Sequence, residues 1–449
     1  MKKGIGMIVL VGFAITVAYS RESYKDLDIF AEAFSYVTSA YVEPSKAEPK
    51  KLIYGAINGM LSALEDPFTR FMAPEAHKNM ETEIAGQFGG LGIVITIKDG
   101  KLIVISPIED TPAWKIGVRA DDCITHIDGT STEGITLQGA VSKLRGQPGT
   151  DVTITIARSG ESDPIIYTIT RDIIKIKTVK WEVVDDKIVY MRITSFNNNT
   201  TSELDEAISK ILEKNPEYII LDIRNNGGGT LQASVGALSR FVDQGTLIVY
   251  TKGREGTPEL RYYAEDSGRR IKQKMAVLIN GGTASGAEIV AGALKDYKRG
   301  VLLGKKTFGK ASVQTVYSLS DGSGLALTTG YYYTPAGNLI HNKGIEPEIV
   351  VDCEEIPEEK RRMIQKFEDG DFSEDFVGKY STWTDKEISE FIESLNKQGI
   401  NIEKKYILRD LEKERRKSKE ERLPIADLYC DNQLLRAIEL IKVAKFFKE

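Results

Sequence analysis

Two short apolar runs constrain the fold of this 449-residue chain more than any other feature of its sequence. The runs occupy residues 218–223 and 276–279, and a glycine-rich stretch follows each of them. Runs of this kind are typical of strands that are buried on both faces, as in a sheet with helices on either side. Helical patterns lie before the first run, at 202–212, and after the second, at 288–295. Strands and helices alternate in this way over residues 179–351, which predicts an α/β layer.

The residues before this layer have the period of a β-rich module. Isoleucines alternate with other residues at 93–97, an Asp-Gly pair follows, and a second strand-like run occupies 102–105. An Asp-Gly pair between two such runs predicts a β-hairpin. We also expect a helix at 137–144 and an alternating strand at 152–156. The sequence therefore predicts a compact, mostly β domain over residues 86–171.

Both ends of the chain carry helical patterns. Residues 26–80 repeat apolar side chains at helical spacing and predict an N-terminal helical region at 21–85. Residues 353–449 are rich in charge and include a Thr-Asp-Lys-Glu capping box at 384–387. We expect this extension to be a pair of solvated helices, followed by a final amphipathic helix near Leu434.

Residues 1–20 have the pattern of an export signal. A pair of lysines precedes an apolar stretch at 4–19, and the small residues Ala18 and Ser20 close it. This order is typical of a secretory signal peptide, and an uncleaved membrane anchor is the alternative. We therefore expect an exported protein that acts in the periplasm or at the extracytoplasmic face of the membrane, with this segment as its anchor if it is not cleaved.

The composition argues against three classes of function. The formal net charge is −5 and the sequence has no basic stripe with interleaved aromatic residues, so we expect no binding to nucleic acid. The three cysteines, Cys123, Cys353 and Cys430, lack the spacing of a zinc site or of a disulfide framework. The sequence contains no His-Glu-x-x-His and no Walker loop. We therefore expect the protein to need no metal and no cofactor.

Ser285 is the candidate nucleophile. It lies between the strand expected at 276–279 and the helix expected at 288–295, in the turn Asn-Gly-Gly-Thr-Ala-Ser-Gly. Backbone N–H groups at the start of a helix are unpaired, and together with the helix dipole they can stabilise a developing oxyanion. Gly286 offers one such N–H without a side chain in the way.

Lys310 is the candidate base for this serine. A lysine can accept a proton when burial disfavours its charged form and lowers its pKa. An apolar run at 301–304 precedes Lys310, and a Phe-Gly pair adjoins it. Gln314 would face the same side in an extended segment, where its amide could orient the lysine nitrogen. From these residues alone, an ordinary helix cap at Ser285 and a surface lysine remain the alternative.

Several further motifs, in the same order along the chain, resemble those of the carboxyl-terminal processing peptidases, also called tail-specific proteases. These are serine peptidases with a Ser-Lys dyad and an inserted PDZ domain. The similar segments extend over residues 28–352, which makes the match specific. Besides the serine and lysine segments, they are Leu-Glu-Asp-Pro-Phe-Thr at 64–69, the Gly-Gly-Leu-Gly-Ile loop at 89–93, the glycine-rich strand end at 221–229, Tyr-Thr-Pro-Ala-Gly at 333–337 and Gly-Ile-Glu-Pro-Glu-Ile at 344–349.

The resemblance implies a multidomain fold with α/β and β parts. Its centre would be an α/β protease core with a crotonase-like layered arrangement at 172–352, and a PDZ domain would occupy 86–171. An N-terminal helical segment at 21–85 and a charged helical C-terminal extension at 353–449 would complete the chain after the signal peptide or membrane anchor at 1–20.

The resemblance also implies roles for the candidate residues. Ser285 would be the nucleophile and Lys310 the general base, with Gln314 as the glutamine that completes a triad in part of the family. The N–H groups of Gly286 and of one glycine in the glycine-rich strand end, foremost Gly228, would form the oxyanion hole.

Two positions beside the serine depart from the family's pattern. The chain has Gly286 where relatives often carry alanine, and Ala287 where they often carry a second serine. Any helper role of that second hydroxyl is therefore absent or moved. A Ser-His arrangement is the alternative to the dyad, and His341 is the only histidine that could serve it.

The PDZ module would read the substrate. Gly90, Leu91, Gly92 and Ile93 would hold a peptide's C-terminal carboxylate with backbone N–H groups, while the peptide adds as a strand. A glycine-rich hairpin without a ligand is the alternative from these residues alone. Arg145 lies where some relatives use a PDZ arginine to couple peptide binding to the protease domain.

Taken together, the sequence predicts an exported serine endopeptidase of the cell envelope that recognises the C-termini of protein substrates and cleaves near them. Its partners would be protein or peptide substrates, and a second copy of the chain, since some relatives dimerise through terminal segments. The alternative is a catalytically inactive PDZ adaptor that presents C-termini to another protease.

Overall fold

The computed structural model of this chain describes residues 21–446, apart from residues 109, 110, 120, 159, 160, 162, 267, 353, 355 and 420. The segment expected to be a signal peptide or anchor, 1–20, lies outside the described residues. None of the helices within the described part has both the length and the hydrophobicity of a membrane span. The described residues form two compact units: 21–74 together with 316–327, and 75–315 together with 328–446.

The smaller unit contains two helices, α1 (Arg21–Ala40) and α2 (Pro49–Ser62). Glu48 starts α2 by accepting hydrogen bonds from the N–H groups of Lys50 and Lys51, and Pro49 fills the first helical position. The short strand β1 (Arg70–Met72) follows and pairs with residues 324–326 of β18 (Gly324–Tyr333). The helical region expected at 26–80 is therefore broken twice, between α1 and α2 and again at β1.

The larger unit contains a six-stranded sheet in the order β10-β11-β12-β15-β16-β19. Neighbouring strands from β11 to β19 are parallel, whereas β10 pairs with β11 in the antiparallel direction. The strands are β10 (Val179–Asp185), β11 (Ile188–Ile193), β12 (Tyr218–Asp222), β15 (Lys274–Ile279), β16 (Gly300–Gly304) and β19 (Ile349–Val350).

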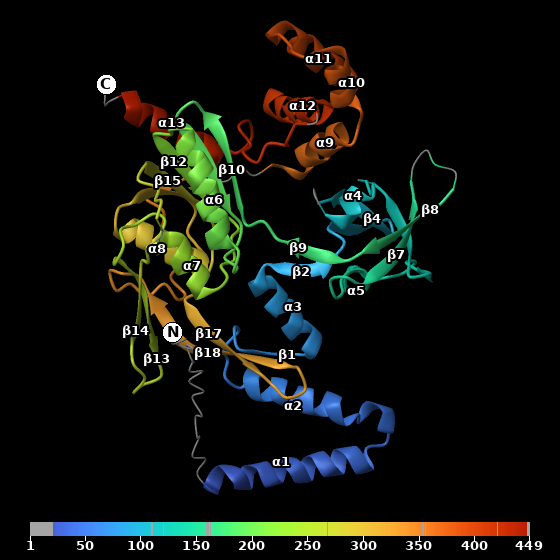
Figure 1. The fold of residues 1–449 in the computed structure, drawn as a ribbon, viewed down its shortest axis with the longest axis vertical. Coiled ribbons are helices and arrows are strands. Elements are labelled where there is room, and N and C mark those ends of the chain that lie inside the picture. Colours follow the sequence, from blue (N-terminus) through green and yellow to red (C-terminus); the bar gives the residue numbers. More distant parts are fainter. Residues whose placement is uncertain are drawn as a thin grey trace, which may run out of the picture. The chain divides into compact units, whose positions relative to one another are not determined.

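Helices cover both faces of this sheet (Figure 1). Side chains such as Ile219 and Val277 pack in the cluster that includes α6, α7 and α8, whereas their neighbours Ile220 and Leu278 pack in the cluster that includes α13. All of β12 is buried, so the α/β layer and the two-faced burial of both apolar runs are confirmed. The helices are α6 (Thr200–Glu213), α7 (Leu231–Leu238), α8 (Gly286–Asp296) and α13 (Asn432–Phe446).

A second sheet, which also contains β1, supplies the strands that follow the candidate lysine. Within it, β18 pairs with β13 through Tyr333 and Tyr250, and β13 pairs in turn with β14. β17 also pairs with β18. Besides β1 and β18, the strands of this sheet are β13 (Leu247–Gly253), β14 (Leu260–Tyr263) and β17 (Ser312–Ser318).

The β-rich module is confirmed, and its main sheet has the order β3-β4-β5-β7-β8. Asp99 and Gly100 join β3 to β4, and both have positive φ, at 51° and 75°, as a tight hairpin turn requires. A second pair, β2 with β9, extends beyond the boundary expected at 171. The elements are α3 (Pro74–Ala85), β2 (Gln87–Gly90), β3 (Ile93–Lys98), β4 (Lys101–Pro107), α4 (Pro112–Lys115), β5 (Cys123–Ile127), β6 (Thr130–Ser131), α5 (Leu137–Leu144), β7 (Asp151–Ala157), β8 (Ile165–Thr170) and β9 (Asp172–Lys175).

The charged extension is more ordered than a solvated helix pair, and that expectation is wrong. Four helices precede α13, and they share an apolar core that includes Phe367, Leu395 and Leu411. Thr384 caps the third of them through the predicted capping box. The four are α9 (Glu358–Glu368), α10 (Phe372–Lys379), α11 (Asp385–Lys397) and α12 (Lys404–Ser418).

Candidate active site

Ser285 lies at the sharp turn between β15 and α8, at the N-cap position of the helix. Its backbone has φ 55° and ψ −121°, a conformation that side-chain-bearing residues rarely adopt. Holding a residue there costs about 1–3 kcal/mol, and such strain clusters at functional sites. The serine is half-buried and directly precedes Gly286, the first residue of the helix.

Lys310 follows the loop that leaves β16 and precedes β17. Ala311 and Val313 pack into the large core cluster, so Lys310 and Gln314 share the opposite face of the chain. The Nζ of Lys310 donates to Oε1 of Gln314 at 3.3 Å. Both side chains are half-buried, and the predicted lysine–glutamine contact is therefore present.

A buried carboxylate, Glu288, joins the serine turn to the lysine loop. Its Oε2 accepts from the N–H of Ser285 at 3.0 Å and from the N–H of Lys310 at 2.8 Å. Its Oε1 accepts from the N–H of Gly309 at 2.7 Å and from Oγ1 of Thr307. Burial raises the pKa of Glu288, although these hydrogen bonds act in the opposite direction. The sequence analysis missed this role, and the signal for it was the Ser-x-x-Glu spacing of a capping box.

A buried phenol, Tyr332, also contacts both candidate residues. Its hydroxyl donates to the backbone carbonyl of Lys310 and lies near the side chain of Ser285. Burial raises the pKa of Tyr332, so this hydroxyl keeps its proton. Tyr332 lies on β18, and no local sequence signal distinguishes it from Tyr331 and Tyr333 on either side.

The glycine-rich strand end lies against the serine. A Cβ added to Gly228 would be 2.7 Å from the nitrogen of Gly286 and 2.7 Å from Cβ of Ser285, so only glycine fits there. Gly286 is the first residue of α8, where a helix leaves its N–H unpaired. The N–H of Gly228, however, donates to Oδ1 of Asn226 at 2.8 Å. Gly228 is therefore placed beside the serine as expected, with its N–H already engaged.

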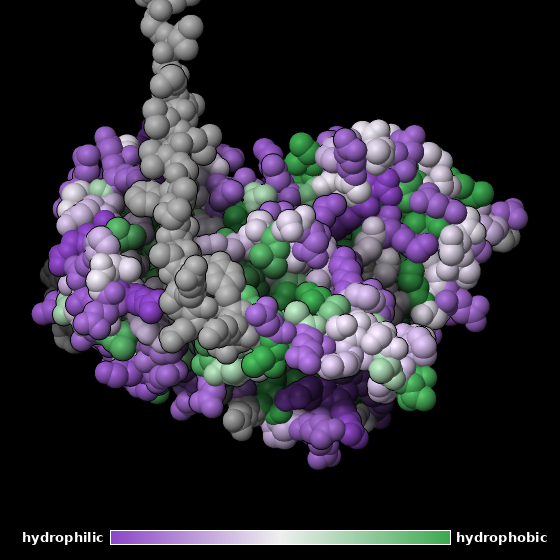
Figure 2. Space-filling model, turned by 90° about the horizontal axis from the view of Figure 1, so that it is seen from below, coloured by the Kyte–Doolittle hydropathy of each residue, from purple (hydrophilic) through white to green (hydrophobic). Residues whose placement is uncertain are grey.

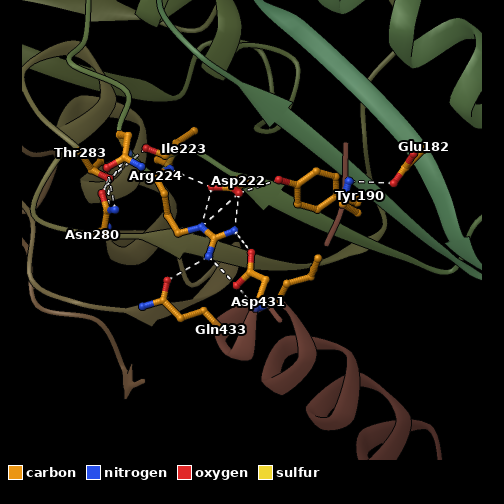
Figure 3. A network of polar contacts seen from close by, with 12 residues as sticks. Glu182, Tyr190, Asp222, Ile223, Arg224, Asn280, Thr283, Asp431 and Gln433 are labelled. Carbon is orange, nitrogen blue, oxygen red and sulfur yellow. Dashed lines mark hydrogen bonds and ion pairs between the residues drawn. The ribbon is translucent and has the colours of Figure 1, made fainter. Parts of the chain in front are cut away.

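Hydrogen bonds hold this strand end to the turn that carries the serine. The N–H of Asn225 donates to Oδ1 of Asn280 at 2.9 Å, and Oγ1 of Thr283 donates to the carbonyl of Ile223 at 2.9 Å (Figure 3). The N–H of Ala284, the residue before Ser285, donates to the carbonyl of Asn226 at 2.9 Å. The position of the glycines relative to the serine is thus set by a short ladder of bonds.

The carboxylate-binding loop expected at Gly90–Ile93 leads into β3, which is an edge strand of its sheet. Gly92 has φ 78°, and a Cβ there would lie 2.2 Å from the side chain of Thr111. Its carbonyl accepts from the N–H of Ile108 and from Oγ1 of Thr111, while Leu91 is buried in the module's core. A strand edge led by a fixed glycine loop is the geometry that peptide addition needs.

Arg145 lies close to this loop. Its guanidinium is 4.1 Å from the ring centroid of Phe88 in β2, and burial lowers its pKa. A Cβ on Gly90 would be 3.9 Å from Cγ of Arg145. The structure therefore brings the candidate regulatory arginine to the start of the candidate carboxylate loop.

A Ser-His arrangement would depend on His341. His341 packs against Tyr331, with 4.7 Å between ring centroids. Within the described residues, no group of three or more His, Cys, Asp or Glu side chains is arranged to hold a metal ion.

Three segments match known domain families. Residues 187–351 match Peptidase family S41, residues 103–158 match the PDZ domain, and residues 15–76 match the Activating protease CtpB N-terminal domain.

Several known proteins are similar to this chain. The "Carboxy-terminal-processing protease" of Bartonella bacilliformis is 42% identical over 349 residues, which cover 77% of this chain and 79% of that protein. The "Carboxy-terminal processing protease CtpA" of Bacillus subtilis is 36% identical over 322 residues, 72% of this chain and 68% of that protein. Among solved structures, the "Photosystem II D1 C-terminal processing protease" is 33% identical to this chain, with a TM-score of 0.43. The match covers 74% of this chain and 94% of that protein's chain.

Proposed function

Because this chain belongs to peptidase family S41 and carries a PDZ domain, we propose that it is a serine endopeptidase that recognises the C-termini of proteins and cleaves them with Ser285 and Lys310. The observation that carries the proposal is the carboxylate of Glu288, which binds the backbone N–H groups of both Ser285 and Lys310. This shared carboxylate ties the backbone of a nucleophile on a strained turn to the backbone of its base, which supports the assignment of the pair.

In the proposed mechanism, the neutral amine of Lys310 takes the proton of the Ser285 hydroxyl as Oγ attacks the scissile carbonyl. Gln314 orients the lysine nitrogen. The lysine then gives that proton to the leaving amine as the acyl-enzyme forms, and a water molecule deprotonated by Lys310 hydrolyses the ester.

The oxyanion of each tetrahedral intermediate would be held by the N–H groups of Gly286 and Gly228. Since the Gly228 N–H donates to Oδ1 of Asn226 in this structure, it has to exchange that acceptor for the oxyanion. The negative charge of the intermediate makes the exchange favourable, because hydrogen bonds to charged acceptors are the stronger ones.

The PDZ domain would supply the substrate. A C-terminal carboxylate would bind the backbone of Gly90, Leu91, Gly92 and Ile93, and the peptide would extend along the free edge of β3. Arg145 lies on the ring of Phe88 beside this loop. It would couple peptide binding at the loop to the activity of the protease core. Residues 86–171 and 172–352 remain the proposed bounds of the two domains.

The protein would act outside the cytoplasmic membrane, with residues 1–20 as signal peptide or anchor.

It would also form a homodimer. The smaller unit supports the dimer, because α1 exposes several large apolar side chains: Leu27, Ile29, Phe30, Tyr36 and Val37. Figure 2 shows hydrophobic groups among hydrophilic ones on one face of the molecule. Analytical ultracentrifugation should find a dimer for the wild type and a monomer for Phe30→Glu, and a wild-type monomer at micromolar concentration would refute the dimer.

Cleavage of a paired set of peptides tests the function. One peptide has an apolar C-terminal residue with a free carboxylate, and the other is the same sequence with an amidated C-terminus. The wild type should cleave the free acid and cleave the amide at least tenfold more slowly, and Ser285→Ala should cleave neither. Binding of the free acid by the wild type without any cleavage would instead indicate the PDZ adaptor, and equal cleavage of both peptides would refute recognition of the C-terminus.

A further inference from the structure

The guanidinium of Arg224 is the most heavily bonded side chain near the glycine-rich strand end. Its Nε and Nη2 donate to the carboxylate of Asp222, at 3.0 and 2.7 Å, and its Nη1 donates to Oδ1 of Asp431 at 2.8 Å and to Oε1 of Gln433 at 3.0 Å. Nη2 also donates to Oδ2 of Asp431. Figure 3 shows Arg224 between Asp222 and the end of α13 that carries Asp431 and Gln433.

These contacts use all five N–H donors of the arginine, and they hold it in a largely buried site. The side chain of Arg224 is 11% exposed, that of Asp222 is 0% exposed and that of Asp431 is 19% exposed. Burial alone would lower the pKa of Arg224, but the bonds and charges of Asp431 and Asp222 more than offset this and raise it. Arg224, Asp222, Asp431 and Gln433 form what we call the Arg224 clamp.

The clamp joins two distant parts of the chain. Asp222 ends β12, whereas Asp431 precedes the first turn of α13 and lies 207 residues after Arg224. Asp431 also accepts from the N–H of Leu434 at 3.0 Å, so it caps the helix that it connects to the arginine. Nε2 of Gln433 donates to the carbonyl of Val351, which fixes the helix to the end of β19 as well.

Only a few residues separate the clamp from the candidate oxyanion hole. Asn225 follows Arg224 directly and is bonded to Asn280. Asn226 binds the N–H of Gly228 with its side chain and the N–H of Ala284 with its carbonyl. A shift of Arg224 would therefore move Asn226, which binds both the N–H of Gly228 and the N–H of the residue before Ser285.

We propose that Asp431 and Gln433, at the start of α13, are positioning residues that keep the glycine-rich strand end in register with Ser285 by clamping Arg224. This inference rests on the proposed function, since it takes Ser285 as the nucleophile. It extends the catalytic machinery to a C-terminal helix that lies beyond residues 187–351, the part that matches the peptidase family.

Asp431→Asn is the variant that tests the clamp. Asparagine caps a helix as well as aspartate does, so α13 should keep its start. The change removes the charge and turns one acceptor that faces the guanidinium into a donor. We expect kcat per titrated active site to fall at least tenfold while KM stays within twofold of the wild type. Gln433→Met, which keeps the volume and removes the amide, should lower kcat in the same direction by a smaller factor.

Glu439→Gln is the matched control, because it removes a charge from the same helix at an exposed pair with Arg436. It should keep wild-type kcat.

A peptide boronic acid, which forms a tetrahedral adduct with the serine, should bind Asp431→Asn more weakly by about the factor lost in kcat. A product peptide that docks without reacting should bind this variant and the wild type equally well.

The proposed positioning role is refuted if folded Asp431→Asn keeps its kcat and its affinity for the boronic acid within twofold of the wild type. If this variant does not fold, Gln433→Met decides by the same two measurements. These outcomes are separate from a failure of the proposed function, which would appear as cleavage that persists in Ser285→Ala.

Discussion

At the scale of single residues, two buried side chains link the candidate nucleophile to its candidate base. Glu288 binds their backbone N–H groups, and Tyr332 binds the carbonyl of Lys310 near the side chain of Ser285. Neither group transfers a proton in the proposed mechanism, so both act by holding the geometry of the pair. Small displacements of reacting atoms cost large factors in rate, which makes these positions sensitive to conservative substitutions.

Glu288→Gln should lower kcat at least tenfold in a folded protein. Glutamine has the same shape but offers one acceptor oxygen where four donors converge on two. Either the N–H groups of Ser285 and Lys310 or the donors of Thr307 and Gly309 therefore lose their acceptor. Steady-state kinetics with active-site titration measures the effect. Glu346→Gln, which alters an exposed pair with Lys306, is the control and should retain full activity.

The difference in stability between the wild type and Glu288→Gln should depend on pH. Burial raises the pKa of Glu288, so its contribution to stability is full below the usual value of 4.5 and is lost as the pH rises through the folded-state pKa. Glu288→Gln has no such titration. The free energy of unfolding of the wild type minus that of the variant should therefore decrease between acid and neutral pH in urea titrations, and an increase would contradict the assignment.

Tyr332→Phe should lower both stability and activity. The variant leaves the carbonyl of Lys310 without its phenol donor, at a cost of about 1–2 kcal/mol in the free energy of unfolding. We expect the acylation rate to fall threefold or more, because the serine hydroxyl loses a fixed neighbour as well. Tyr331→Phe removes a hydroxyl from the adjacent, partly exposed position and should change neither quantity by as much.

At the scale of the elements, the turns after β12 and β15 determine the site more than the strands do. Gly228→Ala should abolish detectable cleavage, since a Cβ would lie 2.7 Å from both the Gly286 nitrogen and the Ser285 Cβ, and φ is 97°. Gly227→Ala is the matched control, because a Cβ at that position meets nothing within 4 Å. Equal activity of the two variants would show that the glycine-rich strand end does not approach the serine during catalysis.

These strand–turn–helix units could be predicted from the sequence because their signals are local. Apolar runs buried on both faces identified β12 and β15, and the turn residues after them identified the places where chemistry could lie. The start of α6 is less accurate: the helix expected from residue 202 already begins at Thr200. Helix boundaries depend on one or two hydrogen bonds, and so they are the weaker part of such predictions.

At the scale of the whole molecule, the order of domains followed from collinear motifs, whereas contacts between distant segments did not. The pairing of β1 with β18 joins segments about 250 residues apart in sequence and has no local signal. The shared core of α9–α12 was missed for a related reason, since charged residues dominate the sequence and mask the apolar faces. The Arg224 clamp and the contacts of Tyr332 belong to the same class of long-range contacts.

Trapping of the acyl-enzyme is the measurement that tests the central claim most directly. Wild type, Ser285→Ala and Lys310→Ala would be mixed with the free-acid peptide, quenched in acid after milliseconds to seconds, and analysed by intact mass and peptide mapping. The account predicts an adduct of the N-terminal product on Ser285 in the wild type, and neither adduct nor cleavage in folded Ser285→Ala and Lys310→Ala. Product formation that continues in Ser285→Ala, or an undiminished adduct in Lys310→Ala, would contradict it.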